Sequence, residues 1–115
     1  MILICGHAEF PSTADRDLAL SEGAELQRAT REEESGCLEY AFAADPVDGT
    51  RVVILEIWED APSLDAHFMH SNYFEMQKVM ASHGVKGGDI WKYRCDLKGK
   101  IYDDTPRARA DFFDS

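Results

Sequence analysis

The octapeptide RVVILEIW, residues 51–58, is a predicted strand that is apolar on both of its faces. The preceding segment, residues 37–44 (CLEYAFAA), alternates, with Tyr40 and Phe42 on one face. Residues 45–50 (DPVDGT) have the composition of a turn, so the two strands form a predicted antiparallel hairpin. A strand that is apolar on both faces is typical of one covered on both sides. The chain's own helices can cover one side, and we expect a second copy of the chain to cover the other.

The other elements extend the pattern on both sides of this hairpin. Pro11 ends the first strand, Ser12 offers a helix cap, and Gly36 ends that helix in a left-handed turn. The further predicted elements are a strand over residues 2–9, a helix over 15–34, short helices over 63–69 and 72–83, and a strand over 89–97. This order predicts an α+β fold of the ferredoxin-like βαββαβ type with an antiparallel sheet.

At 115 residues the chain is long enough for one domain. We assign residues 1–97 to that domain and residues 98–115 to a C-terminal tail. The tail is polar and charged, which is typical of a disordered end. It also carries large apolar side chains, including Ile101, Tyr102 and Phe112, which would suit an arm that packs on a partner subunit. The sequence leaves both interpretations open.

The charge balance argues against two classes of partner. The chain has 22 acidic and 12 basic residues, a formal net charge of −10. Such a surface repels phosphate backbones and anionic headgroups, so we expect neither nucleic acid nor a membrane as a partner. The start of the chain, residues 1–5, lacks the basic lead of a signal peptide. Cys5, Cys37 and Cys95 form no CxxC pair, which favours a reducing cytoplasm.

Five short motifs follow one another between Glu34 and Met80: E-S-G-C-L-E-Y, D-P-V-D-G, L-E-I-W-E-D, S-L-D-A-H and N-Y-F. Their combination resembles the antibiotic biosynthesis monooxygenase family, which includes quinol monooxygenases and autoinducer-processing relatives. The resemblance covers residues 1–96. It implies a dimeric α/β barrel of two ferredoxin-like subunits, each with a pocket between its sheet and its helices.

The same resemblance implies several different reactions. Characterised members oxidise polycyclic phenols or quinols with O2 and without a metal or organic cofactor, whereas others degrade haem or rearrange a small sugar-derived signal. Haem-degrading relatives carry Trp at the position of His67 and a haem-ligating His at the position of Gln77. Neither residue is present here, which disfavours haem degradation. The fold is therefore better indicated than the reaction.

Two residues are candidates for proton transfer. His67 stands at the frequent His position of the S-L-D-A-H motif, and an imidazole can remove a phenolic proton near neutral pH. Glu56 interrupts the apolar strand and shares a face with Trp58, so burial would raise its pKa unless it is paired. The alternative for His67 is a packing role, and for Glu56 a buried pair with His67 or with an Arg.

Six further residues are candidates for substrate binding: Trp58, Tyr40, Tyr73, Asn72, His7 and Arg94. Flat aromatic substrates stack on aromatic walls, although core packing explains most such side chains equally well. The H-x-x-H spacing at His67 and His70 lacks further convergent ligands, so no metal site is predicted. The run of glutamates at 32–34 is expected to be a solvated helix end.

The residues themselves predict a pocket with one candidate for proton transfer. The resemblance adds the oxygen chemistry, and implies a cofactor-independent monooxygenase, working as a homodimer on a small planar phenol, quinol or polyketide-like substrate with O2. His67, with Glu56, would remove the phenolic proton. Two alternatives remain at this stage: an isomerase acting on a small metabolite through the same proton shuttle, or a non-catalytic ligand-binding or stress protein that retains the fold.

Overall fold

The computed structural model describes residues 1–113, and its elements follow the predicted order. β1 (Ile2–Glu9), β2 (Cys37–Ala44) and β3 (Arg51–Trp58) have the predicted bounds. The helices are α1 (Thr13–Glu33), α2 (Ala61–Phe68) and α3 (Ser71–Ser82), and each begins one or two residues before its predicted start. The last strand is β4 (Lys86–Arg94).

β4 begins and ends three residues before the predicted strand at 89–97. The predicted strand begins directly after Gly87 and Gly88, and glycine is unfavourable inside a strand. In the structure Gly88 pairs with Ala8 of β1, and a β-bulge then brings Lys86 opposite Glu9. Pairing with β1 therefore overrides the local preference of the two glycines.

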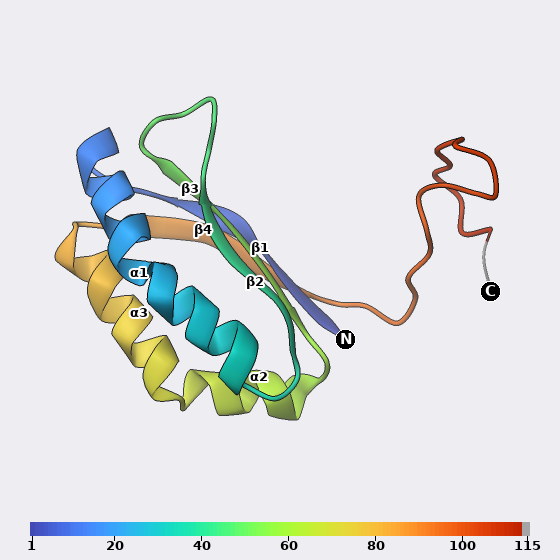
Figure 1. Cartoon of the computed structure of the whole chain (residues 1–115), viewed down its shortest axis with the longest axis horizontal. Helices are drawn as coiled ribbons and strands as arrows, with labels where there is room; N and C mark the ends of the chain where they lie inside the picture. The colour runs from blue at the N-terminus through green and yellow to red at the C-terminus, as the bar shows by residue number, and fades with distance from the viewer. Residues whose placement is uncertain (114–115) are drawn as a thin grey trace.

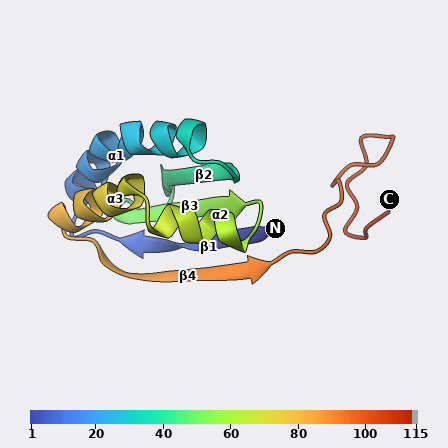
Figure 2. The same ribbon diagram turned by 90° about the horizontal axis from the view of Figure 1, so that it is seen from below.

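The four strands form one antiparallel sheet in the order β2-β3-β1-β4, as Figure 2 shows from one edge of the sheet to the other. Figure 1 shows α1, α2 and α3 together on one side of this sheet. The fold is thus the ferredoxin-like α+β arrangement. Between the layers lies a core that includes Ile4, Ala19, Val52, Trp58, Leu64 and Met76. No helix within residues 1–113 is long and apolar enough to cross a membrane.

The opposite face of the sheet carries apolar side chains that nothing in the described part of the chain covers. Val53 and Leu55 of β3 are 41% and 38% exposed, and Trp91 and Tyr93 of β4 are 63% and 50% exposed. The register places Trp91 beside Cys5 and Cys5 beside Leu55, so these side chains share one surface. We call Val53, Leu55, Trp91 and Tyr93 the outer face. We predicted that β3 is covered on both sides, and within a single chain the helices cover only one of them.

The tail leads away from the body of the molecule (Figure 1). Tyr102 and Ala108 form an isolated antiparallel bridge, and Arg109 contacts Asp103 at 3.7 Å. Ile101 and Tyr102 are largely exposed. Residues 114 and 115, part of the predicted tail, lie outside the described residues.

Candidate functional site

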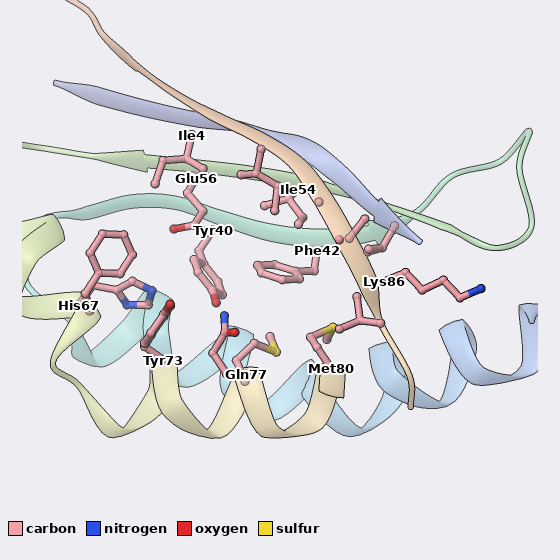
Figure 3. A pocket seen from close by; sticks show the side chains of 18 residues that line it. Ile4, Tyr40, Phe42, Ile54, Glu56, His67, Tyr73, Gln77, Met80 and Lys86 are labelled. Atoms are coloured by element: carbon pink, nitrogen blue, oxygen red, sulfur yellow. The ribbon is translucent and has the colours of Figure 1, made fainter. Parts of the chain in front are cut away.

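A cavity of about 330 Å³ lies between the sheet and helices α2 and α3 (Figure 3). Its floor consists of three successive rungs of neighbouring side chains on the helix-facing side of the sheet. The first, second and third rungs are Tyr40–Glu56–Ile4, Phe42–Ile54–Ile90 and Val52–Ala8–Gly88, with Gly6 between Ile54 and Ile90 in the sheet. Helices α2 and α3 form its roof with His67, Phe68, Tyr73, Met76, Gln77 and Met80. The cavity is therefore mostly apolar. Its ionisable groups are Tyr40, Glu56, His67 and Tyr73 at the first rung, which we call the polar end, and Lys86 at the rim.

His67 is held at this end by a buried carboxylate. Its Nδ1 lies 2.7 Å from Oε1 of Glu34, and the two side chains are 1% and 5% exposed. The amide of Asn72 donates to the other oxygen, Oε2 of Glu34, at 3.1 Å. Because an ionised carboxylate only accepts hydrogen bonds, Nδ1 of His67 carries the proton. In the neutral ring the lone pair is then on Nε2, the nitrogen on the far side of the ring from Glu34, which is the position of a general base.

Glu34 reaches this position because the chain turns sharply after α1. Glu34 is the residue that caps the helix, and its backbone leaves the helical conformation there. Gly36 follows with φ at +85°, and a Cβ at this position would lie 2.1 Å from Oγ of Ser63. Only glycine combines this backbone conformation with this close approach. The E-S-G-C motif thus directs a carboxylate from the end of α1 toward α2 and α3.

Aromatic rings hold the imidazole on several sides. The ring of Trp58 lies 4.5 Å from that of His67 at an interplanar angle of 33°, and Tyr40 and Tyr73 approach edge-on at 5.5 and 5.4 Å. Figure 3 shows the hydroxyl groups of both tyrosines directed toward the space beside His67. Burial raises the pKa of Tyr40, so its hydroxyl stays protonated at neutral pH. Both tyrosines can therefore donate a hydrogen bond to an oxygen of a bound molecule.

Glu56 is the second carboxyl group at the polar end. Its Oε1 accepts a hydrogen bond from Nε1 of Trp58 at 3.0 Å. Burial raises the pKa of Glu56, while this hydrogen bond and the nearby His67 act in the opposite direction. The structure thus places two buried carboxyl groups in unlike surroundings, because Glu34 pairs with two side chains and Glu56 with one.

The raised pKa of Glu56 predicts a pH-dependent effect of Glu56→Gln on stability. Between the unfolded and folded pKa values the folded wild type binds more protons, so its stability falls as pH rises. The glutamine does not titrate and can still accept from Trp58. The variant should therefore gain stability relative to wild type between pH 4.5 and pH 8. Urea unfolding at both pH values measures this gain, and a constant difference would contradict the assignment.

Comparison with known proteins agrees with the fold. The model of the antibiotic biosynthesis monooxygenase family matches residues 12–79, which include Glu34, Glu56 and His67. This chain belongs to that family. No curated protein sequence matches it significantly.

Solved structures show the same fold at low sequence identity. A Deinococcus radiodurans protein, provisionally described as an antibiotic biosynthesis monooxygenase, is 19% identical, covers 90% of this chain and 100% of its own, and has a TM-score of 0.78. An antibiotic biosynthesis monooxygenase structure is 23% identical, with 84% and 100% coverage and a TM-score of 0.71. A Bacteroides thetaiotaomicron protein of unknown function, for which an oxidoreductase role is suggested, is 18% identical, with 80% and 94% coverage and a TM-score of 0.70.

Four of the predicted site residues meet at the cavity of this family member. His67, Glu56, Tyr40 and Tyr73 all line it. Trp58 and Asn72 do not, since Trp58 packs against the His67 ring and Asn72 binds Glu34. Their contact with a substrate would be indirect.

The structure does not bring His7 or Arg94 to the cavity. His7 lies on the opposite face of β1 from Ile4 and Ala8, and its Nε2 is 3.8 Å from Asp89. Arg94 faces the helix side but pairs with Ile2, beyond the polar end of the cavity. Within one chain, neither His7 nor Arg94 is therefore placed to bind a substrate in this cavity.

Glu34 is the site residue that the sequence analysis missed, and its predicted place on a solvated helix end is wrong. The prediction treated residues 32–34 as one charged run. Glu34 lies four residues after Thr30, which belongs to the buried stripe of α1, so helical periodicity places it on the inner side. That spacing, followed by Ser-Gly, was the available signal. The sequence left open a buried pair of Glu56 with His67 or with an Arg. In the structure Glu34 pairs with His67, and Glu56 accepts from Trp58.

Proposed function

We propose that this family member is a cofactor-independent monooxygenase that oxidises a small phenol or quinol with O2. The observation that carries the proposal is the buried Glu34–His67 pair at one end of an apolar cavity. An imidazole oriented by a carboxylate is suited to remove a proton and to hold the resulting positive charge. The apolar walls exclude water from the anion that forms.

In the first step the hydroxyl of the substrate lies against Nε2 of His67, with Tyr40 and Tyr73 able to donate to its oxygen. The O–H bond breaks, the proton moves to Nε2, and the imidazolium is stabilised by Glu34. The phenolate is far more electron-rich than the phenol. Deprotonation therefore prepares the ring to give up an electron.

In the second step the phenolate passes one electron to O2, giving a phenoxyl radical and superoxide. These combine to form a carbon–oxygen bond at an unsubstituted ring carbon. Loss of the hydrogen on that carbon and cleavage of the O–O bond yield a quinone, and the second oxygen atom leaves as water with the proton returned by His67. Overall, one phenol and one O2 give one quinone and one water.

An oxygen electrode tests the proposal with a panel of alkylphenols and quinols. We expect O2 uptake that depends on the enzyme, with one quinone formed for each O2 consumed. Addition of a metal chelator should leave the rate unchanged. Tight binding of the same compounds without O2 uptake would overturn the monooxygenase assignment.

A proton-shuttling isomerase is a second candidate, because His67 and Glu56 place a base and a raised-pKa acid at the same end of the cavity. Such an enzyme would exchange substrate hydrogen for solvent deuterium without consuming O2. A ligand-binding protein would show neither reaction and would retain affinity when His67 is replaced. Deuterium exchange, measured by NMR beside the oxygen electrode, therefore separates the three functions.

The uncovered outer face supports a homodimer as the working form. Contiguous exposed apolar surface on a folded domain marks an interaction site, and the central strand β3 is covered by helices on its other side only. A second copy, placed face to face, would cover both sheets at once. The free cysteines of the described chain suit the reducing cytoplasm as the compartment.

Leu55→Asp should separate the dimer, because it places a charge at the centre of the outer face. By light scattering, wild type should have twice the 12.9 kDa mass of one chain and the variant 12.9 kDa. Val47→Asp is the matched control, since Val47 lies in a loop and is 94% exposed. A wild type of 12.9 kDa at micromolar concentration would contradict the dimer.

The tail fits the same dimer as an arm on the partner subunit. Its large apolar side chains, Ile101, Tyr102 and Phe112, are 60 to 62% exposed in the single chain, and the segment extends beyond the end of β4 (Figure 2). Removing residues 98–115 should therefore weaken dimerisation without unfolding the domain.

A further inference from the structure

We infer that the substrate is a phenol with its hydroxyl group or groups at one end only and a single apolar chain at the other. The inference rests on the proposed function, and deepens it, because the polarity of the cavity changes in one direction along its length. His67, Glu56, Tyr40 and Tyr73 meet at one end. Figure 3 shows Ile54, Phe42 and Met80 on the other side of Gln77 from these groups.

The floor of the cavity shows this change rung by rung. The first rung contains Tyr40 and Glu56, the second contains only apolar side chains, and the third is made of Val52, Ala8 and Gly88. Side chains two residues apart on one face of a strand are about 6.6 Å apart. A molecule lying along the floor therefore passes from ionisable groups to hydrocarbon within roughly the length of one aromatic ring.

The roof changes in the same direction. On α3, Tyr73 lies at the polar end, Met76 and Met80 follow along the helix, and Val85 comes after its end. The helix rises about 1.5 Å per residue, so Tyr73 and Met80 are separated by about 10 Å. Thioethers are flexible and polarisable, and adapt to an alkyl or prenyl chain of variable shape. The floor and the roof therefore favour the same orientation of a molecule with a polar head and an apolar tail, which we call a head-and-tail molecule.

Two polar residues lie outside the polar end, and neither provides a second polar subsite. Gln77 lies between the two ends, where its amide can contact the edge of a ring (Figure 3). Lys86 lines the rim, but Figure 3 shows its side chain leading away from the cavity. The volume of about 330 Å³ is at the small end for ligand pockets. One ring with a short chain therefore fits better than a polycyclic molecule with polar groups on both sides.

Calorimetric binding of 4-alkylphenols tests the inference in the absence of O2 chemistry. Each methylene added between methyl and pentyl should lower Kd by about two- to fourfold. Phenols of the same length that end in a hydroxyl or carboxylate should bind at least tenfold more weakly than 4-pentylphenol. A Kd that does not change with the length of the alkyl chain would overturn the inference. So would a phenol ending in a carboxylate that binds more tightly than 4-pentylphenol to wild type and loses this advantage in Lys86→Met.

Two variants at the apolar end locate the chain. Ile90→Asn adds a polar group on the exposed edge strand, and Val85→Phe shortens the cavity. Both should reduce the gain per methylene, and should weaken the binding of 4-pentylphenol more than that of phenol itself. Val47→Asn, in the exposed loop, is the control and should keep the full gain.

The outcomes for the inference and for the proposed function are distinguishable. A steep alkyl series without O2 uptake would support the head-and-tail cavity and reject the monooxygenase. O2 uptake with an alkyl series that is flat would support the monooxygenase and reject the head-and-tail cavity.

Discussion

Replacing His67 with glutamine is expected to lower the rate of O2 consumption by 10²- to 10⁴-fold, the usual range for loss of a general base. Glutamine keeps a similar length and can donate a hydrogen bond to Glu34, but its amide cannot accept a proton. The substrate should therefore still bind, within about threefold of the wild-type affinity, and remain in the phenol form. Oxygen-electrode rates together with calorimetric Kd values measure both effects.

His83→Gln is the matched control for this experiment. His83 also pairs with a carboxylate, at 2.9 Å from Glu22, but lies at the end of α3 and does not line the cavity. We expect it to keep the wild-type rate. A His67→Gln enzyme that retained more than a tenth of the wild-type rate would show that His67 has a packing role only.

Replacing Glu34 with alanine is expected to lower the free energy of unfolding by about 2–4 kcal/mol. The change removes both oxygen acceptors, so Nδ1 of His67 and the amide of Asn72 lose their partners while remaining buried. Unpaired buried polar groups are among the few causes of large single-residue losses. Urea unfolding followed by circular dichroism measures the change.

Glu33→Ala provides the control one position earlier in the chain. The Glu33 side chain is 55% exposed and lies 3.8 Å from Arg28, so its loss should change stability by less than about 0.5 kcal/mol. If the two alanine variants had equal stability, the buried pair would not be present in solution. Glu34→Gln keeps the shape but removes the charge, so we expect a folded protein whose O2 consumption is slowed at least tenfold.

Much of the fold could be predicted because local signals and tertiary packing agree in most elements. The alternation of Tyr40 and Phe42 and the turn at residues 45–50 define the hairpin, and the structure confirms its bounds. β4 is the exception. Its first residues include Gly87 and Gly88, which have little strand preference, and only the ladder to β1 extends them.

The sequence predicts those site residues that stand out within their own helix or strand. His67 and Glu56 stand out in a helix motif and in an apolar strand, and both line the cavity. The partner of His67 was not predictable in the same way, because Glu34 is 33 residues away in sequence. The spacing from Thr30 and the Ser-Gly turn indicate that Glu34 lies on the inner side of α1. They do not indicate that it meets His67, because that contact depends on how the helices pack together.

The two interpretations of His67 raised by the sequence are compatible in this structure. Its hydrogen bond to Glu34 and its contact with Trp58 are packing interactions that also fix the orientation of the ring. A base held in this way needs no rearrangement when the substrate binds. The stability of α2 and α3 and the position of Nε2 therefore depend on the same contacts.

The central claim is that His67, oriented by Glu34, takes the proton of a bound phenol. The most direct test is the absorption spectrum of 4-nitrophenol bound to the protein, at a pH where the free probe is protonated. We predict that the yellow phenolate band appears on binding to wild type and is absent in His67→Gln at equal occupancy. A bound probe that keeps the spectrum of the neutral phenol in the wild-type protein would contradict the account.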